Sequence, residues 1–502
     1  MVASPRATAP EGGFDRVRRT AGFFAGPALF ALVLLLPAPG ISPEAHRLAA
    51  VLAWVLVFWV SEAIPIPATA LLGPVLCVLL GIAEPAMVLA PFAHPIVFLF
   101  LGSFLLAEGM IVHRLNERAA LMVLSVRWFL KKPGRLALAV GAIPFLVSMW
   151  ISDSATTAMM YPILLGILAT FPKEGAPAGG GRFETGLLLT IAYAALIGGT
   201  GTPVGTPPNL IGIGMLEKLA GVRIPFFQWM LLAIPIALAV GAAMFAWTAL
   251  IFPAARVDPE ATGAAVREMR ARRGPWTRGE KNVLFAFLVA VFLWVFPGVV
   301  ASIAGPQSEL FRFCERHLPE GVASLVAALL LFLLPVDWPL RKFTLAWSEA
   351  LRIDWGTILL FGGGLALGGL MFSTGLADAL GRGLIALSGV TSLWGLTALA
   401  IGLAILMTEM TSNTATANML VPIFIALASS IGVSPVPPAI GVCMGASMAF
   451  MLPVSTPSNA IVYGSGRVPI TAMIRTGFLL DLTSFLVVWA GLRILCPALG
   501  LV

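Results

Sequence analysis

Two short polar segments interrupt hydrophobic sequence and hold the residue types best suited to bind small ions. The first is Ser152–Thr157 and the second is Ser412–Thr416. Both continue through small residues and a methionine to a proline, Pro162 in one case and Pro422 in the other. Hydroxyl and carbonyl oxygens suit a hard cation such as sodium, whereas hydroxyl and amide donors suit a carboxylate. Polar groups at bilayer depth are costly and usually functional, so both segments are candidate binding sites.

The sequence around each segment predicts two half-helices that meet at the polar residues. Each segment lies between two apolar stretches that are shorter than the roughly 20 residues needed to cross a bilayer. We therefore expect re-entrant hairpins at 136–171 and 393–430, with the polar segments at their tips. Irregular backbone at that depth is tolerated only where it is buried in protein or lines a wet cavity. The N-terminal end of each second half-helix would then direct its free N–H groups and positive dipole toward an anion.

Composition places the whole chain in a membrane. Hydrophobic residues make up 59% of the 502 residues and charged residues 11%, whereas a soluble domain has about 25% charged residues. We expect an all-α polytopic membrane protein with about 11 transmembrane helices plus the two re-entrant hairpins. The predicted spans lie near 22–39, 47–63, 68–86, 93–112, 184–214, 226–253, 282–300, 321–335, 356–374, 437–463 and 470–497. The four cysteines form no disulfide or metal-binding pattern.

Basic residues orient the predicted spans with the N-terminus in the cytoplasm. Of the 31 Lys and Arg residues, those left on the outer side are Arg47, Lys218, Arg223, Arg312, Arg316, Arg382 and Arg493. A retained first helix is favoured over a signal peptide, because no convincing small-x-small cleavage site is present and further spans follow at once. The predicted regions are a cytoplasmic N-terminus and first helix at 1–46, repeat 1 at 47–253, a cytoplasmic linker at 254–281 and repeat 2 at 282–502. The basic run Arg270–Arg273 is interpreted as topogenic charge near anionic lipid rather than a nucleic-acid site.

The two halves contain the same motifs in the same order. The Gly-rich stretch Phe100–Met110 resembles Phe361–Met371, and the break Gly205–Ile211 resembles Val454–Ile461. Five spans and one hairpin in each half make an odd number of crossings, so the second half must be inverted relative to the first. Two inverted repeats with discontinuous helices are a recurring transporter architecture, with the binding site near the bilayer midplane.

At these residues the chain resembles the divalent anion:sodium symporter family, which carries dicarboxylates, citrate and sulfate. The stretch Thr408–Thr416 matches the second Ser-Asn-Thr signature of that family fully, and Ser148–Ser154 matches the first with two departures. Gly205–Asn209 and Trp59–Pro65 are further matches. The resemblance extends over nearly the whole chain from about Arg47.

The resemblance implies two sodium sites, one substrate site, a homodimer and an elevator-like movement of the hairpin domain. The first sodium site would use Ser148, Ser152, Asp153 and Gly201. The second would use Thr408, Thr411, Asn413 and Ser455. The substrate would lie between the tips, in contact with Ser152, Asp153, Ser154, Thr202, Thr206, Ser412, Asn413, Thr414, Thr456 and Pro457.

The two departures are Asp153 and Ser154, where the family has Asn and Thr. Serine keeps the hydroxyl, but an aspartate places a carboxylate beside the dianion that the site is expected to bind. Three interpretations stay open: Asp153 is a stronger sodium ligand, it binds a proton that travels with the substrate, or the protein is a cation-independent exchanger. Our hypothesis is that Asp153 changes its protonation during the transport cycle and that cation coupling is retained.

The sequence therefore predicts a secondary active transporter of small divalent anions with alternating access. Two tips with short donors suit a compact dianion charged at both ends, so C4-dicarboxylates such as succinate, malate and fumarate are the expected substrates. Citrate and sulfate stay open, because the width of the binding site is not encoded in an obvious motif. Sodium is the expected coupling ion, a proton at Asp153 is the alternative, and no covalent cofactor is expected.

Two other functional classes fit the sequence less well. A membrane-embedded hydrolase needs a nucleophile–base set or a metal motif, and neither lies near the polar segments. A channel usually builds its pore from symmetric subunits or rings, whereas inverted broken hairpins favour alternating access. The expected location is the inner (plasma) membrane of a bacterium, in contact with lipid and without a nucleic-acid partner.

Overall fold

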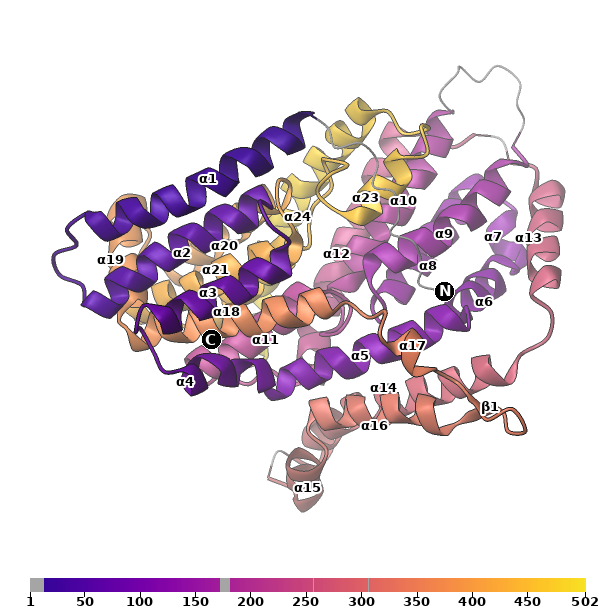
Figure 1. Ribbon diagram of the computed structural model, residues 1–502. Coiled ribbons are helices and arrows are strands. Elements are labelled where there is room, and N and C mark those ends of the chain that lie inside the picture. Colours follow the sequence, from indigo (N-terminus) through magenta and orange to yellow (C-terminus); the bar gives the residue numbers. More distant parts are fainter. Residues whose placement is uncertain (1–12, 172–180, 256, 306) are drawn as a thin grey trace.

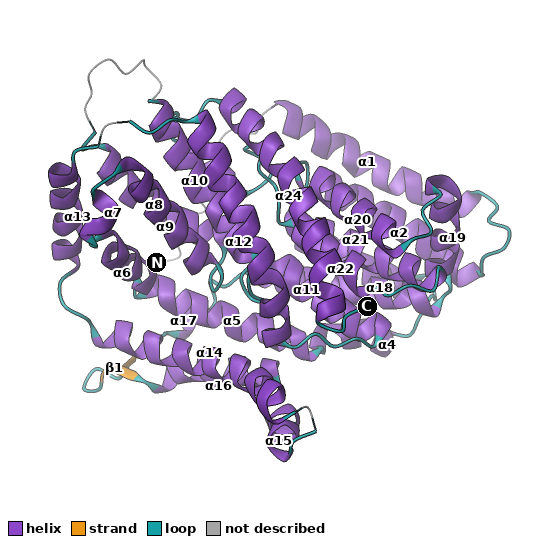
Figure 2. Cartoon of the chain, turned by 180° about the vertical axis from the view of Figure 1, so that it is seen from behind, coloured by secondary structure: helices purple, strands orange, loops and turns teal. Residues whose placement is uncertain are grey.

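The structure is a computed structural model that describes residues 13–171, 181–255, 257–305 and 307–502. Residues 1–12 of the predicted cytoplasmic N-terminus and residue 256 of the predicted linker lie outside the described part. The described chain is helical apart from turns, loops and one short antiparallel pair of strands, β1 (Pro335–Asp337) and β2 (Lys342–Phe343) (Figure 2). The prediction of an all-α polytopic membrane fold is confirmed.

The helices fall into groups before, within and after the predicted linker. Before it lie α1 (Gly13–Leu35), α2 (Pro43–Ser61), α3 (Ile66–Leu79), α4 (Pro85–Leu89), η1 (Ala90–Ala93), α5 (Pro95–Val112), α6 (Leu115–Leu124), α7 (Arg127–Leu130), α8 (Pro133–Ser148), α9 (Asp153–Leu168), α10 (Arg182–Gly199), α11 (Pro207–Ala220) and α12 (Phe226–Ile251). The linker contains α13 (Pro259–Arg273). After it lie α14 (Arg278–Ala304), α15 (Glu309–His317), α16 (Glu320–Leu333), α17 (Trp347–Ala350), α18 (Trp355–Ser373), α19 (Leu376–Ser388), α20 (Leu393–Thr408), α21 (Asn413–Ser430), α22 (Val436–Ala446), α23 (Pro457–Tyr463) and α24 (Ile470–Ala498).

Seven segments of the described chain are long and apolar enough to cross a membrane. They are Arg16–Leu35, Pro43–Ser61, Pro85–Val112, Phe226–Ile251, Arg278–Ala304, Trp355–Ser373 and Ile470–Ala498. A pair bent by 65°, α15 with α16, makes an eighth if it forms one span. The spans predicted at 184–214 and 437–463 are instead divided into shorter helices, α10 with α11 and α22 with α23. The total of about eleven spans therefore stays a prediction.

Both polar segments lie at the start of the second of two consecutive helices that pack side by side. Helix α8 ends at Ser148 and α9 begins at Asp153, whereas α20 ends at Thr408 and α21 begins at Asn413. Within each pair the helices are in contact, and two opposite views show them adjacent (Figures 1 and 2). The polar residues thus occupy the turn of a helical hairpin, as the alternation of apolar and polar sequence indicates.

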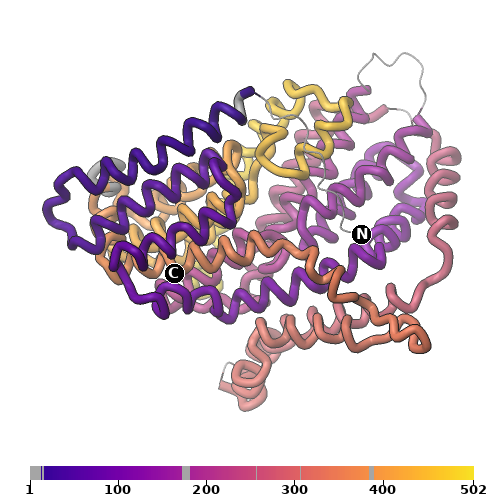
Figure 3. Tube along the Cα trace, viewed as in Figure 1, coloured from indigo at the N-terminus to yellow at the C-terminus, as the bar shows by residue number. Residues whose placement is uncertain are grey.

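Each hairpin packs on the first half of a broken span in its own part of the chain. Helices α8 and α9 contact α10, and α20 and α21 contact α22. Glycine permits this close approach, because a Cβ on Gly198 would collide with the carbonyl oxygen of Phe145. A Cβ on Gly445 would lie 3.0 Å from the carbonyl oxygen of Ile401. Distant segments also meet, since α3 packs against α18 although most of the chain separates them (Figure 3).

Candidate transport site

The first hairpin tip is organised by short hydrogen bonds at the start of α9. The hydroxyl of Ser152 caps this helix by accepting from the N–H of Ala155 at 3.3 Å. The carboxylate of Asp153 accepts from the N–H of Ser154 at 2.7 Å and lies 3.3 Å from its hydroxyl. Ser152 is exposed and the next two residues are half-buried, whereas Ser148 at the end of α8 is fully buried. The tip therefore presents polar groups outward while a second hydroxyl lies behind it.

The buried side of this tip faces the break between α10 and α11. The hydroxyl of Thr202 donates to the carbonyl oxygen of Met149. The Ser148 hydroxyl lacks a hydrogen-bond partner among the described residues, and a Cβ on Gly199 would lie 3.5 Å from it. Gly201 lies beside the Met149 side chain. Since buried hydroxyls are nearly always satisfied, the Ser148 oxygen is a candidate ligand for a bound ion.

An asparagine holds each of the two helix breaks in the same way. The side-chain amide of Asn209 donates to carbonyl oxygens ten and seven residues earlier, at 3.0 and 2.7 Å. The amide of Asn459 donates to carbonyl oxygens ten and seven residues earlier, at 2.9 and 3.1 Å. In both residues the side-chain oxygen is buried without a hydrogen-bond partner in the described part of the chain. The sequence similarity of the two breaks thus corresponds to the same hydrogen-bond geometry.

Three oxygen atoms converge at the second hairpin tip. The hydroxyl oxygen of Thr408 lies 2.6 Å from the side-chain oxygen of Asn413 and 2.6 Å from the carbonyl oxygen of Ala446. A hydroxyl has one hydrogen, so it can donate to only one of these two acceptors at a time. Hydroxyl, amide and backbone carbonyl oxygens are ligands that hard cations prefer. The arrangement can therefore bind a small cation, with Thr408 and Asn413 as the sequence predicts.

Ser455, the remaining residue implied for the second sodium site, contacts Glu409, which follows Thr408 in the chain. Its hydroxyl lies 2.6 Å from the Glu409 carboxylate and 3.0 Å from the Glu409 carbonyl oxygen. The same carboxylate accepts from the N–H groups of residues 451 and 452, at 2.8 and 3.1 Å. Within the described chain no hydrogen bond joins Ser455 to Thr408 or Asn413. The Ala446 carbonyl oxygen contacts Thr408. Sequence reasoning missed it, because a backbone oxygen has no residue-type signal.

The remaining predicted site residues lie at the two tips or at the breaks. Ser412 and Thr414 are half-buried, and Thr411 contacts the Met407 carbonyl oxygen at 3.0 Å and the Thr416 hydroxyl at 2.8 Å. Thr206 and Thr456 are buried N-cap residues of α11 and α23, and Pro457 is exposed. The Thr456 hydroxyl accepts from the Asn459 N–H at 3.2 Å.

Each break packs against the hairpin of the other half. Helix α23, which begins after Thr456, contacts α9 and α10. Helix α11, which begins after Thr206, contacts α21 and α22. These crossed contacts place a helix break from one half beside a hairpin from the other half. A single binding site shared between the two halves requires this arrangement.

A buried polar cluster beside the second tip was missed by sequence reasoning. Asp481 of α24 is 5% exposed and faces the Glu409 carboxylate. The Phe450 N–H lies near Asp481, but neither Asp481 oxygen has a hydrogen bond of normal geometry in the described residues. The Tyr193 hydroxyl donates to the Phe450 carbonyl oxygen at 2.9 Å. An acidic residue inside the apolar segment of α24 was the signal that could have indicated this cluster.

Polar hairpin tips and helix breaks buried inside an apolar helical bundle are characteristic of secondary transporters. Residues 18–499 match the family described as the transmembrane region of sodium:sulfate symporters. The chain belongs to this family, the divalent anion:sodium symporters, and the resemblance noted in its sequence is confirmed. It is an integral membrane transporter and not an enzyme.

Relatives of known name are similar over most of their length. The chain is 34% identical over 490 residues to the sodium-dependent dicarboxylate transporter SdcS of Staphylococcus saprophyticus, with 96% of this chain and 92% of the relative covered. It is 33% identical over 482 residues to the transporter of the same name from Staphylococcus aureus, with 93% and 89% covered. A solved structure of the Alcanivorax borkumensis YdaH transporter is 13% identical, with a TM-score of 0.49 and 97% and 98% of the chains covered.

Proposed function

We propose that this protein is a sodium-coupled symporter of C4-dicarboxylates such as succinate, malate and fumarate, in the plasma membrane of a bacterium. The observation that carries the proposal is the convergence of the Thr408, Asn413 and Ala446 oxygens at the second tip. This ligand set suits sodium, and the similar staphylococcal proteins are named as sodium-dependent dicarboxylate transporters.

Two sodium ions would bind behind the two tips. At the second tip the ligands are Thr408, Asn413 and the Ala446 carbonyl, with Thr411 nearby. At the first tip they are Ser148, Ser152, Asp153 and Gly201, and the unpartnered buried hydroxyl of Ser148 supports this assignment. Neither polar segment contains Lys or Arg to balance the charge of a dianion. The positive charge of each sodium ion would therefore lower the free-energy cost of placing the dianion in the membrane.

The substrate would lie between the tips with one carboxylate directed to each. Helices α9 and α21 begin at the tips, so their first N–H groups and positive dipole ends can stabilise a carboxylate. Hydroxyls from both tips and from the breaks supply further donors, namely Ser152, Ser154, Thr202, Thr206, Ser412, Thr414 and Thr456. A compact dianion satisfies both ends of such a site at once.

Transport would proceed by an elevator-type movement of the hairpins in a homodimer, with the two halves as inverted repeats. The matched hydrogen bonds of Asn209 and Asn459 support the repeat. The crossed packing of α11 and α23 on the opposite hairpins supports movement of the two tips and two breaks as one unit.

A second candidate function is cation-independent exchange of dianions, and Asp153 favours it. A carboxylate at the first tip already supplies the negative charge that would repel a substrate carboxylate. In such an exchanger one dianion leaves for each dianion that enters, so uptake would follow the dianion gradients and not a sodium gradient.

The proposal is tested by uptake of labelled succinate into proteoliposomes that contain the purified protein. An inward sodium gradient should drive accumulation, and replacement of sodium by potassium should abolish it. Excess malate and fumarate should compete more strongly than citrate or sulfate. Uptake that needs internal dicarboxylate but no sodium would overturn symport in favour of exchange, and stronger competition by citrate or sulfate would overturn the C4 assignment.

The role of Asp153 is tested by exchanging the acid and the amide between the tips. Asp153→Asn should weaken sodium activation of uptake and change its pH dependence, whereas the matched variant Asn413→Asp adds a charge at the second tip instead. Identical sodium and pH profiles for wild type and Asp153→Asn would show that Asp153 is not the coupling group.

A further inference from the structure

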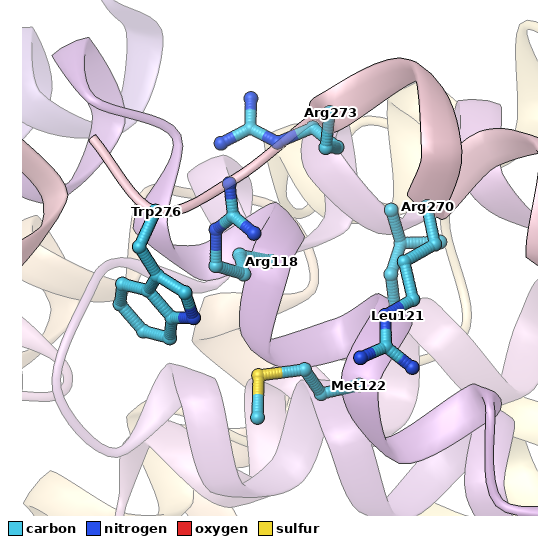
Figure 4. A pocket seen from close by; sticks show the side chains of 6 residues that line it. All are labelled: Arg118, Leu121, Met122, Arg270, Arg273 and Trp276. Carbon is cyan, nitrogen blue, oxygen red and sulfur yellow. The ribbon is translucent and has the colours of Figure 1, made fainter.

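Arginines from two separate segments converge where the linker helix meets the end of α5 and the start of α14. Arg118 comes from α6, whereas Arg267, Arg270 and Arg273 come from α13. They line a cleft of about 410 Å³ and a smaller adjoining cavity of about 50 Å³, together with Trp276. Figure 4 shows Arg118 and Trp276 on one side and Arg270 extending toward Met122 below.

The inner part of this cluster is rigidly built. The Arg118 side chain is 9% exposed and donates to Glu280 at 2.7 Å and to the carbonyl oxygens of Gly274 and Pro275 at 3.2 and 3.1 Å. Arg273 also donates to Glu280 at 2.7 Å. A guanidinium has five N–H donors, so Arg118 keeps donors beyond these three bonds. The indole of Trp276 lies 5.0 Å from the Arg118 guanidinium carbon and shields one face of it.

The outer part of the cluster has uncompensated positive charge. Arg267 and Arg270 are exposed and one helical turn apart, and neither forms an ion pair within the described chain. Glu280 and Glu117 are the two carboxylates that pair with the inner arginines. Four guanidinium groups and two carboxylates leave a net positive cleft. Arg272 on the same helix differs, because it pairs with Glu268 at 2.5 Å.

Exposed apolar side chains continue from the cleft. Met122 lines the smaller cavity and is 47% exposed, and Val126 and Trp128 beyond it are also exposed. The guanidinium of Arg135 lies 4.3 Å from the Trp128 ring centre. Tryptophan and arginine side by side are typical of the boundary between bilayer and water. The cleft also lies beside the C-terminal end of α5 and the N-terminal end of α14, two helices that belong to candidate membrane spans.

We propose that this cleft binds the phosphate of an anionic phospholipid headgroup, with Arg267 and Arg270 as the outer donors and Arg118 as the inner one. Guanidinium groups bind phosphate oxygens through paired N–H donors. The adjoining Met122, Val126 and Trp128 surface then contacts the acyl chains. A bound lipid would join α6 to the linker helix α13 and so connect the two halves of the transporter.

The test measures thermal unfolding of the purified, detergent-solubilised protein during titration with short-chain phosphatidylglycerol. The wild type should be stabilised progressively, because a ligand that binds only the folded state raises its unfolding temperature. The double variant Arg267→Gln/Arg270→Gln should need about tenfold more of the lipid for the same stabilisation, since two basic side chains at the lipid surface are removed. Arg272→Gln, which removes a paired arginine from the same helix, should respond like the wild type.

Two further titrations identify what the cleft recognises. Short-chain phosphatidylcholine and inorganic phosphate at the same concentrations should each stabilise the wild type far less than phosphatidylglycerol. Equal stabilisation by phosphatidylcholine, whose phosphate is neutralised by its choline group, would show that the cleft does not select an anionic headgroup, and equal stabilisation by phosphate would show a soluble ligand instead. A double variant that responds like the wild type would place the lipid elsewhere. Any of these three results would overturn the proposal.

Discussion

The two hairpin tips share a plan but differ in how each is fastened to its helix break. At the second tip the Glu409 side chain binds the N–H groups of residues 451 and 452 and the hydroxyl of Ser455. At the first tip the position 260 residues earlier is Met149, and the side chain of Thr202 donates to its backbone carbonyl instead. The second tip is therefore held to its break by several side-chain hydrogen bonds, whereas among the described residues the first tip is held by the Thr202 hydroxyl.

The tips also differ in charge. Asp153 places a carboxylate at the start of α9, where it already accepts the Ser154 N–H and benefits from the positive end of the helix. Asn413 places a neutral amide at the start of α21 with its oxygen directed to Thr408. The comparison teaches that the two tips derive from one sequence pattern but offer different groups, a carboxylate at the first tip and a neutral amide at the second.

Removal of the amide at the second tip should give the largest effect. Asn413→Ala deletes one of the three converging oxygens and a donor near the substrate, so sodium-dependent uptake should fall by about 100-fold. The measurement is initial succinate uptake into proteoliposomes as a function of sodium. Asn418→Ala, one turn further along α21, is the control because its amide binds the Thr414 carbonyl at 2.9 Å. An Asn413→Ala protein with wild-type sodium activation would refute the site.

The hydrogen bonds that Glu409 makes at the second tip should contribute measurably to the free energy of unfolding. Glu409→Ala leaves the N–H groups of residues 451 and 452 without their acceptor, at a cost of about 1–3 kcal/mol for each group that stays dry, whereas the Ser455 hydroxyl keeps the Glu409 backbone carbonyl as an acceptor. The matched change at the first tip, Met149→Leu, leaves the Thr202 hydrogen bond in place and should cost less than about 1.5 kcal/mol. Thermal unfolding of both variants gives the comparison, and equal losses would show that the tips are fastened alike.

Much of the fold was predictable because each feature had a local sequence signal. The hairpins at 136–171 and 393–430 correspond to α8–α9 and α20–α21, since polar residues between short apolar stretches cannot form a simple span. The helix α13 in the linker was not predicted, because its sequence lacks apolar periodicity strong enough to distinguish it from a polar loop. Its position is set instead by contacts with α6, α7 and α9, which depend on the assembled fold.

Site residues could be predicted where they are side chains within one sequence motif. They could not be predicted where they belong to helices that are distant in the sequence. Thr408 and Asn413 are five residues apart, and the structure brings them together. The Ala446 carbonyl and Asp481 come from other helices, and their approach depends on tertiary packing. Ser455 illustrates the converse, since its assignment by resemblance did not anticipate that Glu409 would bind its hydroxyl.

The acidic pair beside the second tip gives a smaller effect of opposite sign. Asp481→Asn removes one of two facing carboxyl groups where α12, α20 and α22, which pack against α24, contribute no Lys, Arg or His. We expect it to stabilise the protein by about 1–3 kcal/mol, because neither Asp481 oxygen forms a hydrogen bond of normal geometry among the described residues and a buried acid in that state is costly. The control Asp378→Asn changes an acid on α19 away from this cluster. A large loss of stability in Asp481→Asn would mean that the cluster binds a cation.

The smallest difference in stability between matched variants is expected at the two helix breaks, where both halves have the same hydrogen bonds. Asn209→Ala and Asn459→Ala each remove an amide that holds two carbonyl oxygens, so each should destabilise the protein by about 1–3 kcal/mol. Because the hydrogen bonds match in spacing and length, the two losses should agree within about 0.5 kcal/mol, and the double variant should show their sum if the sites are independent. Unfolding of the three variants measures this. A clear difference between the single variants would show that the breaks, like the tips, have diverged, whereas equality would mean that the asparagine hydrogen bonds of the two breaks contribute equally to stability.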